Sequence, residues 1–188
     1  MFDSMGSILE ALSPEQQIAC STQNNILLTA CPGSGKTRTL THRLAYQVLR
    51  DPASKKIKIA ITYTNRAAEE ITNRLEGMNI DQSSIWAGTI HQFCMHFIIR
   101  PYAMYSKRLC KGYRIIDDYS KKAYGREIAE RLGMHLNYYG DPFQYENVRT
   151  EYKRVLKEKK EIDFDAILLI SEELLASCAF IGSNIASV

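Results

Sequence analysis

The chain has 188 residues, of which 45% are hydrophobic and 24% are charged, and its formal net charge is +3. This length suffices for one domain with a hydrophobic core, or for one domain that carries a small insert. The charge alone does not indicate nucleic acid, and no apolar run approaches the ~20 residues of a membrane helix. Residues 1–12 lack the pattern of a secretory signal. Because the cysteines are odd in number and form no C-x-x-C pair, we expect free thiols and a cytoplasmic protein, and the lack of a long apolar run predicts no membrane partner. The cysteines are Cys20, Cys31, Cys94, Cys110 and Cys178.

Up to Pro101, short apolar runs alternate with amphipathic segments. Ser13, Pro14 and Gln16 have the spacing of a capping box, which predicts a short helix that begins after Ser13. Periodicity predicts strands over 25–30, 57–64 and 84–89, and helices over 36–50, 65–78 and 90–100. This alternation predicts an α/β fold built on a parallel sheet with flanking helices.

After Pro101 the pattern becomes mostly helical and charged, with one more short strand expected over 113–117. We expect helices to account for most of 118–134 and 145–178. The chain then divides into the first part of an α/β core over 1–117, a helical insert over 118–160, and a helix that returns to the core over 161–188.

The segment Ala30–Thr37, "ACPGSGKT", stands between a predicted strand and a predicted helix. The backbone N–H groups of such a loop surround phosphate oxygens, and the helix dipole assists them. Lys36 would bridge the outer phosphates, and the hydroxyl of Thr37 would bind Mg²⁺, so these two are the candidate catalytic residues. The alternative is a chance Gly-Ser turn before a helix. The remaining candidate phosphate-binding residues of the loop are Pro32, Gly33, Ser34 and Gly35.

Four further motifs surround the loop, in a fixed order. "LSPEQQIA" (12–19) precedes it, and "AITYTNRAAEEITNRL" (60–75), "GTIHQF" (88–93) and "IDFDAIL" (162–168) follow. Together they resemble the UvrD/Rep/PcrA-type DNA helicases of superfamily 1, which commonly have alanine at the position of Ala30. In that family the first motif is the Q motif, the next two are motifs Ia and Ib, and the last precedes the second acidic motif.

The resemblance covers residues 12 to about 168. It implies a RecA-like P-loop NTPase fold, ATP and Mg²⁺ as cofactors, single-stranded DNA as a partner, and the activity of an ATP-dependent DNA helicase. Gln16 would then read the adenine edge, since its amide can both donate and accept a hydrogen bond. It could equally serve in the capping box, and both roles can hold. Arg38 would lie near the nucleotide, unless it is only a solvated helix charge.

The same resemblance places single-stranded DNA at the ends of two predicted strands. Tyr63, Asn65 and Arg66 follow the strand over 57–64, and an aromatic ring near motif Ia stacks on a base in that family. Thr89 and His91 occupy motif Ib, which contacts the DNA backbone there. The ends of parallel strands are also where ligands gather in α/β sheets. The alternative for Tyr63 is a ring packed in the core.

Two other patterns were considered: a possible metal site, which we reject, and a basic segment with tyrosines, for which two interpretations remain. His91, Cys94 and His96 resemble a metal cluster, but no fourth ligand is evident, and we assign Cys94 and His96 to a packing face. The segment from Arg100 to Lys122 mixes cations with tyrosines, which suits a path for a single strand or, equally, a solvated face with packed tyrosines. Its cations are Arg100, Lys107, Arg108, Lys111, Arg114, Lys121 and Lys122, and its tyrosines are Tyr102, Tyr105, Tyr113 and Tyr119.

Hydrolysis in this class also needs a second acid and, in the family, an arginine from a second RecA-like domain. Neither is found in the sequence, so we expect an N-terminal fragment of a longer helicase. Its partner would be the missing C-terminal part, and alone it would bind nucleotide without useful turnover. The motif "DFDA" ends in alanine where the family often has aspartate, which leaves the role of that position open. Two rivals remain: a complete small P-loop kinase or nucleotidase with Asp117 or Asp118 as the second acid, and a non-catalytic nucleotide- or nucleic-acid-binding protein.

Overall fold

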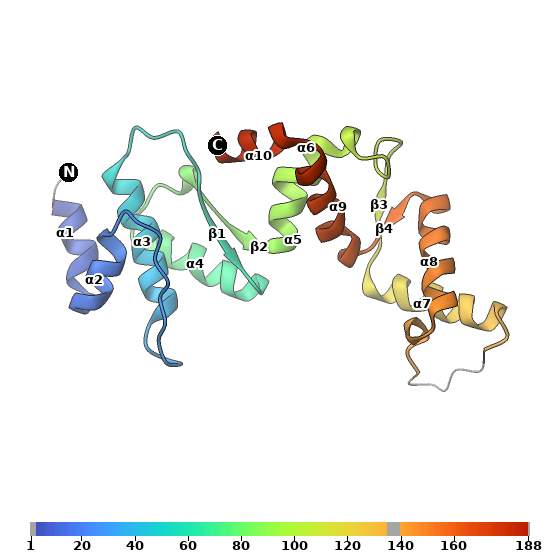
Figure 1. Ribbon diagram of the computed structural model, residues 1–188. Coiled ribbons are helices and arrows are strands. Elements are labelled where there is room, and N and C mark those ends of the chain that lie inside the picture. Colours follow the sequence, from blue (N-terminus) through green and yellow to red (C-terminus); the bar gives the residue numbers. More distant parts are fainter. Residues whose placement is uncertain (1–2, 135–139, 188) are drawn as a thin grey trace. The chain divides into compact units, whose positions relative to one another are not determined.

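The computed structural model describes residues 3–134 and 140–187, which fall into two compact units (Figure 1). The first unit contains the residues up to Ile90, together with the last residues of the chain, and the second contains His91–Ala186. The elements of the first unit are α1 (Asp3–Glu10), α2 (Pro14–Ser21), α3 (Lys36–Arg50), β1 (Lys58–Thr62), α4 (Asn65–Gly77) and β2 (Ile85–Thr89).

The elements that follow β2 begin with α5 (Ile90–Phe93), whose first residue still belongs to the first unit. After it come η2 (Cys94–Ile99), which is a π-helical stretch, α6 (Arg100–Tyr102), η3 (Ala103–Tyr105), β3 (Arg114–Ile115), α7 (Asp118–Arg131), α8 (Glu146–Lys159), β4 (Glu161–Ile162), α9 (Phe164–Ser177) and α10 (Ala179–Ser187). Within the described parts of the chain, no helix combines the length and the apolar character needed to cross a membrane.

The first unit is built on a parallel pair of strands. β1 and β2 pair in register, with Lys58 opposite Ile85 and Thr62 opposite Thr89, and α4 connects them. The core forms where α3, α4 and β1 bring apolar side chains together, among them the buried residues Leu44, Ala60, Ile71, Leu75 and Val48. The strands predicted over 57–64 and 84–89, and their parallel arrangement, are confirmed.

Local signals fix where the helices of this unit begin and end. At the start of α2 the Ser13 hydroxyl accepts a hydrogen bond from the Gln16 backbone N–H, and the side chain of Gln16 accepts one from the Ser13 N–H at 3.1 Å. This is the predicted capping box. α3 runs from Lys36 to Arg50 and ends at Asp51 as expected.

The strand predicted over 25–30 is wrong. Residues 25–30 belong to no helix or strand and pair with no other strand, and Leu27 is 89% exposed. A strand needs a neighbour whose backbone groups complete its hydrogen bonds. Among the residues described, the only partner of β1 is β2, so the apolar run before the loop has no ladder to join. Apolar character alone therefore does not make this segment a strand.

The second unit contains a short strand pair, of which the first strand was expected over 113–117 and the second was not expected. β3 pairs in parallel with β4, with Arg114 opposite Glu161 and Ile115 opposite Ile162. Helices account for most of 145–178 as expected, but they are interrupted at Lys160, which takes a left-handed conformation with φ of 54° and ends α8. Asp163 then caps α9 by accepting a hydrogen bond from the Ala166 N–H at 2.9 Å.

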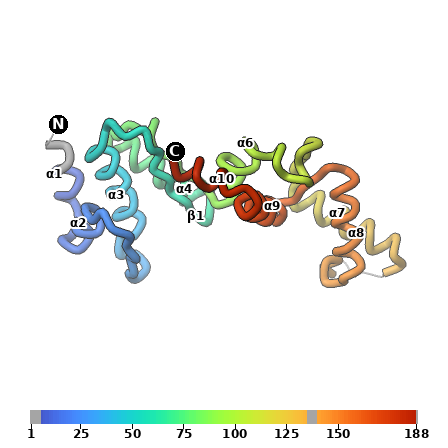
Figure 2. The backbone as a smooth tube through the Cα atoms, turned by 45° about the horizontal axis from the view of Figure 1, so that its top comes forward, coloured from blue at the N-terminus to red at the C-terminus, as the bar shows by residue number. Residues whose placement is uncertain are grey.

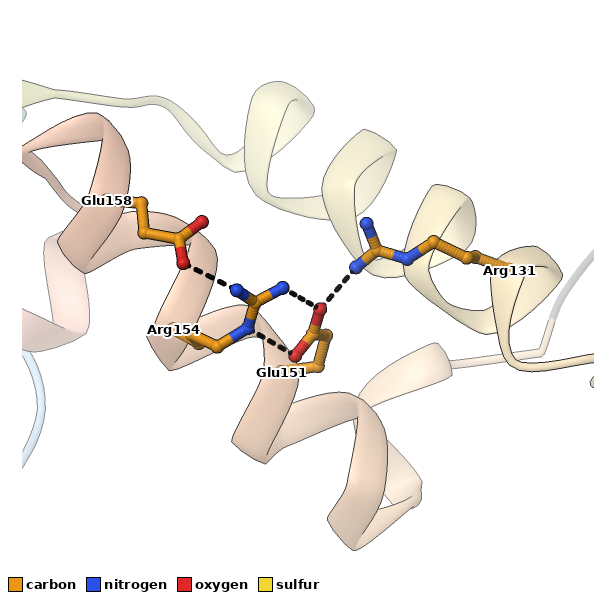
Figure 3. A network of polar contacts seen from close by, with 4 residues as sticks. All are labelled: Arg131, Glu151, Arg154 and Glu158. Carbon is orange, nitrogen blue, oxygen red and sulfur yellow. Dashed lines mark hydrogen bonds and ion pairs between the residues drawn. The ribbon is translucent and has the colours of Figure 1, made fainter.

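α7 and α8 pack against each other around their own apolar cluster, in which Ile128, Val148 and Leu156 are buried (Figures 1 and 2). An ion-pair network joins the exposed side of the pair (Figure 3). The Glu151 carboxylate accepts from Arg131 of α7 at 2.5 Å and from Arg154 of its own helix at 2.6 Å, and Arg154 also pairs with Glu158 at 2.5 Å. Such exposed pairs contribute little individually, so the apolar contact dominates.

One glycine in this contact has no room for a side chain. A Cβ atom built on Gly125 of α7 would lie 2.7 Å from the Pro142 Cγ atom and 2.8 Å from the Phe143 Cζ atom. The Phe143 ring is itself packed edge-on against Tyr152, with 4.9 Å between ring centroids. Because both neighbours are rings held by packing, they cannot yield freely. The close approach of α7 to residues 142–143 thus depends on glycine.

We therefore predict that Gly125→Ala lowers the free energy of unfolding by about 1–3 kcal/mol, the usual cost of overpacking. Gly182→Ala in α10 is the matched control, because nothing lies within 4 Å of the corresponding Cβ position. It should instead stabilise α10 by about 0.5–1 kcal/mol through helix propensity. Urea unfolding of both variants measures the difference. Equal stability of the two variants would contradict the crowding at Gly125.

Candidate functional site

The loop before α3 has the backbone shape that a phosphate site requires. Gly33 and Gly35 have φ values of 80° and 87°, a region that side-chain-bearing residues rarely occupy. Gly35 is the N-cap residue of α3, and no side chain caps that end. The first N–H groups of the helix are therefore without intrahelical partners, and the positive end of the helix dipole lies at the loop. This arrangement favours an anion at the start of α3.

Lys36 is folded back over its own loop. Its Nζ atom donates to the carbonyl oxygen of Ala30 at 2.6 Å and to that of Cys31 at 2.7 Å. These acceptors are neutral, and the lysine side chain is exposed. A phosphate oxygen carries charge and would form a stronger hydrogen bond with the ammonium group than either carbonyl does. The lysine is thus held beside the loop by bonds that an anion can replace.

Gln16 connects α2 to the same loop. Its Nε2 atom donates to the Ser34 carbonyl oxygen at 3.1 Å, while its Oε1 atom accepts from the Ser13 N–H. The amide therefore uses both its donor and its acceptor within the protein, and the capping-box role predicted for it is present. A Cβ atom on Gly35 would lie 3.1 Å from Gln16 Nε2, so the contact also depends on glycine at that position.

Arg38 and Thr37 lie in the first turn of α3. The Arg38 guanidinium donates to the Ala11 carbonyl oxygen at 2.6 Å, which ties α3 to the segment before α2. The hydroxyl of Thr37 has no hydrogen-bond partner among residues 3–134 and 140–187. The backbone acceptors of this region could not be predicted from the sequence, because every residue type has a backbone carbonyl group. These acceptors are the carbonyls of Ala11, Ala30, Cys31 and Ser34.

The carboxyl ends of β1 and β2 form a second candidate site in the first unit. Thr62 lies opposite Thr89, and its hydroxyl oxygen lies 2.9 Å from the Thr64 carbonyl oxygen and 3.3 Å from that of Gly88, so its one hydrogen has two possible acceptors. Tyr63 follows β1 with 97% of its surface exposed, so the alternative of a ring packed in the core is wrong. Thr89 is buried, with 9% of its surface exposed.

Asn65 and Arg66 are exposed at the start of α4, directly after the Thr64 cap. The structure therefore gathers Tyr63, Asn65, Arg66 and Thr89 at one edge of the strand pair, each within the first unit. An exposed ring with a neighbouring cation and amide can stack on a base and contact a phosphate. This is the chemistry that a single-stranded nucleic acid needs.

His91 belongs to the second unit, where its ring meets Phe164 edge-on with 5.6 Å between centroids. Cys94 is buried in the apolar cluster as expected of a packing face, whereas His96 is exposed and its ring contacts Phe97. In the described stretches of the chain, no three His, Cys, Asp or Glu side chains are grouped as metal ligands. All five cysteines are free thiols.

Asp117 is the N-cap of α7 and accepts a hydrogen bond from the Ser120 N–H at 2.8 Å. The hydrogen bonds from the backbone and side chain of Ser120 hold the pKa of Asp117 below its usual value. Asp118 is the first residue of the same helix. The carboxylate of Asp117 is thus occupied in capping, which is not the arrangement expected of an acid that holds magnesium.

A polar cluster around Asp163 was not predicted from the sequence. The buried Tyr152 donates to Asp163 Oδ2 at 3.0 Å, and Lys121 lies 3.6 Å from the same oxygen and 2.5 Å from Asp165. Burial, followed by the charge of Asp163, raises the pKa of Tyr152. The first aspartate of "DFDA" therefore caps α9 and joins α7 and α8 to it. The alanine that ends the motif, Ala166, is a buried helix position.

Comparisons with known proteins identify a family for most of the chain. The family model described as the UvrD/REP helicase N-terminal domain matches residues 12–141. DNA helicase II of Escherichia coli K12 is 26% identical over 196 aligned residues, which include 89% of this chain and 27% of that protein.

Two relatives match a shorter stretch at higher identity. The ATP-dependent DNA helicase PcrA of Staphylococcus aureus Mu50 is 39% identical over 98 residues, 51% of this chain and 13% of that protein. PcrA of Bacillus subtilis 168 is 40% identical over 95 residues, 50% of this chain and 13% of that protein. The chain thus spans little more than a quarter, or less, of the length of these relatives. Because the matching family model covers more than half of the chain, the protein belongs to the UvrD/REP helicase N-terminal domain family.

Proposed function

We propose that this chain is the ATP-binding N-terminal part of an ATP-dependent DNA helicase with a RecA-like core. The observation that carries the proposal is the loop before α3, where two glycines with positive φ and Lys36 surround an uncapped helix N-terminus. The relatives named ATP-dependent DNA helicase support it, as does the parallel β1–α4–β2 unit. Nucleotide binding and helicase activity are proposals for this chain.

In this proposal the phosphates of ATP lie against the N–H groups of Gly33, Ser34, Gly35 and Lys36, with Pro32 shaping the turn. Lys36 exchanges its two carbonyl acceptors for phosphate oxygens, and the charge makes the exchange favourable. The Gln16 amide can then hydrogen-bond either to the Ser34 carbonyl or to the adenine edge, because its side chain already contacts the loop. Arg38 completes the set from the first turn of α3, where its guanidinium currently meets Ala11.

Thr37 is the proposed ligand for Mg²⁺, since its hydroxyl stands in the first turn of α3 without a partner among the described residues. A hard cation with oxygen ligands fits this group. When bound with the nucleotide, Mg²⁺ neutralises charge that develops on the phosphate oxygens during transfer. Lys36 supplies positive charge to the same oxygens, which makes Lys36 and Thr37 the proposed catalytic residues.

Single-stranded DNA is the proposed partner of the strand ends. Tyr63 supplies an exposed ring for stacking, and Arg66 supplies a cation for a phosphate. Asn65, Thr89 and His91 are the further proposed contacts, on the strength of their positions in the two motifs. A site of this kind binds without reading the base sequence, because every base has a face on which a ring can stack.

The domain organisation is likewise a proposal. We infer a helical insert over 118–160 within a core formed from residues 1–117 and 161–188. The pairing of β3 with β4 supports it, because the strands on either side of the insert adjoin and the chain enters and leaves the insert at one place. The free cysteines are compatible with the cytoplasmic location expected from the sequence.

For the loop, we predict that Lys36→Ala weakens ATP binding by roughly tenfold or more, which corresponds to about 1.4 kcal/mol. The reason is the loss of the ammonium group that lies over the loop. Titration with a fluorescent ATP analogue in the presence of Mg²⁺ measures the affinity. Lys55→Ala is the matched control, because this exposed lysine follows the opposite end of α3. Equal affinity of Lys36→Ala and the parent chain would remove the loop from the account.

For the strand ends, we predict that Tyr63→Ala and Arg66→Ala weaken the binding of a labelled oligo(dT) in different ways. Arg66→Ala should reduce the dependence of log affinity on log salt concentration by about 0.7, because one phosphate contact is lost. Tyr63→Ala should lower the affinity with little change in that slope, since stacking releases no counterions. Fluorescence anisotropy at several salt concentrations gives both quantities. Identical slopes in the two variants would count against the assignment.

A further inference from the structure

A cluster of aromatic side chains covers part of the second unit, outside the proposed sites. Tyr102, Tyr105 and Phe180 meet edge-on or tilted, with ring centroids 5.1 to 6.4 Å apart. Met104 is 72% exposed, Tyr105 51% and Phe180 42%. We call these four residues the Tyr105 surface. Rings in α6 and η3 thus meet a ring of α10; Tyr102 is half-buried, whereas Tyr105 and Phe180 are exposed, and α6 and α10 adjoin in Figure 2.

Contacts of α10 hold the residues of the Tyr105 surface in place. Ile181, the residue after Phe180, is fully buried in the apolar cluster of the second unit. The Asn184 side chain of α10 donates to the Tyr102 hydroxyl at 3.2 Å. The rings are therefore fixed on a packed base before any ligand arrives. Binding on such a surface costs less side-chain entropy than binding on free rings.

The chain segment that carries Tyr102 and Tyr105 has charge of one sign, and the acids nearest to Phe180 in sequence are Glu172 and Glu173 of α9. Residues 91–116 contain no aspartate or glutamate, and α10 contains no charged residue. Arg100, Lys107, Arg108 and Lys111 are exposed, and none of the four side chains forms an ion pair within residues 3–134 and 140–187. Of the other three cations between Arg100 and Lys122, Arg114 pairs with Glu161 and Lys121 with Asp165, whereas Lys122 lies on α7.

We propose that the Tyr105 surface, with Arg100, Lys107, Arg108 and Lys111, is a second contact for single-stranded nucleic acid. A chain segment with exposed rings, unpaired cations and no carboxylate offers what a single strand requires: ring faces for bases and positive charge for phosphates. A protein partner with an apolar patch would leave these four cations without a role. The surface lies in a different unit from Tyr63, so it is a contact additional to the strand-end site.

Affinity and salt dependence test the proposal in the full chain with a fluorescein-labelled oligo(dT). Tyr105→Ala should weaken binding by at least about fivefold, while Tyr105→Phe, which keeps the ring, should bind as the parent does. The double variant Lys107→Ala/Arg108→Ala should reduce the salt slope by about 1.4, for two phosphate contacts. Tyr119→Ala and Lys122→Ala are matched controls, because Tyr119 is 82% exposed and both residues stand on α7 near Asp117 and Asp118.

A photo-cross-linking experiment separates this proposal from the proposed function. An oligonucleotide containing 4-thiothymidine is cross-linked to the parent chain, and the modified peptides are identified by mass spectrometry. Cross-links at Tyr105 or Phe180 support the second contact, whether or not Tyr63 is also modified. Cross-links at Tyr63 alone, with affinity unchanged in Tyr105→Ala, overturn the second contact and leave the strand-end site standing. If Tyr105→Ala instead loses binding to a polyglutamate peptide only, the surface docks acidic protein and the nucleic-acid proposal is wrong.

Discussion

The uncapped N-terminus of α3 is the constraint on which the candidate site depends. No side chain satisfies the first N–H groups of this helix, and the chain enters it through Gly35 in a left-handed conformation. Three neighbouring side chains bind backbone carbonyls around this helix end and leave its N–H groups free of side-chain partners. Lys36 lies over the loop, Gln16 holds Ser34 from the side, and Arg38 ties the first turn to Ala11. A helix end left open in this way destabilises the free protein and favours an anion.

The second unit is held by a different polar centre. Asp163 caps α9 and receives the hydroxyl of Tyr152, while Lys121 balances its charge. A buried carboxylate is costly unless it is paired and hydrogen-bonded, and here both conditions are met. The same residue thus fixes helices that are distant in sequence, since Lys121, Tyr152 and Asp163 come from α7, α8 and the start of α9. The first aspartate of the motif "DFDA" thus has a structural role, in capping and packing helices, that does not involve a nucleotide.

Short-range signals predicted a large part of this structure. The capping box of α2 was predicted from Ser13, Pro14 and Gln16. Hydrophobic periodicity predicted α3, α4, β1 and β2. Each of these depends on residues close in sequence. The strand expected over 25–30 was wrong because a strand also needs a partner, and apolar pattern does not reveal one. β4 was missed for the converse reason: two residues are too few to show a period, and only the pairing with β3 defines them.

The candidate site, too, was predictable where it depends on local residue types and not where it depends on contacts between distant residues. The residue types of the loop indicated phosphate chemistry, because glycine, lysine and threonine have distinctive roles there. The carbonyls that hold Lys36 and Arg38 could not be predicted, since every residue carries one. The mixed segment from Arg100 to Lys122 could not be resolved into paired and unpaired cations either. Its partners Glu161 and Asp165 lie more than forty residues away in sequence, with separations of 47 and 44 residues.

The central claim is that the backbone of the loop and the start of α3 bind the phosphates of ATP. Backbone amide chemical shifts of the ¹⁵N-labelled chain test it most directly, in separate titrations with ATP–Mg²⁺, inorganic triphosphate and adenosine. The account predicts saturable shifts for the amides of residues 33–37 with ATP and with triphosphate, and none there with adenosine. Saturable shifts that leave residues 33–37 unchanged, or no saturable shifts with ATP, would contradict it.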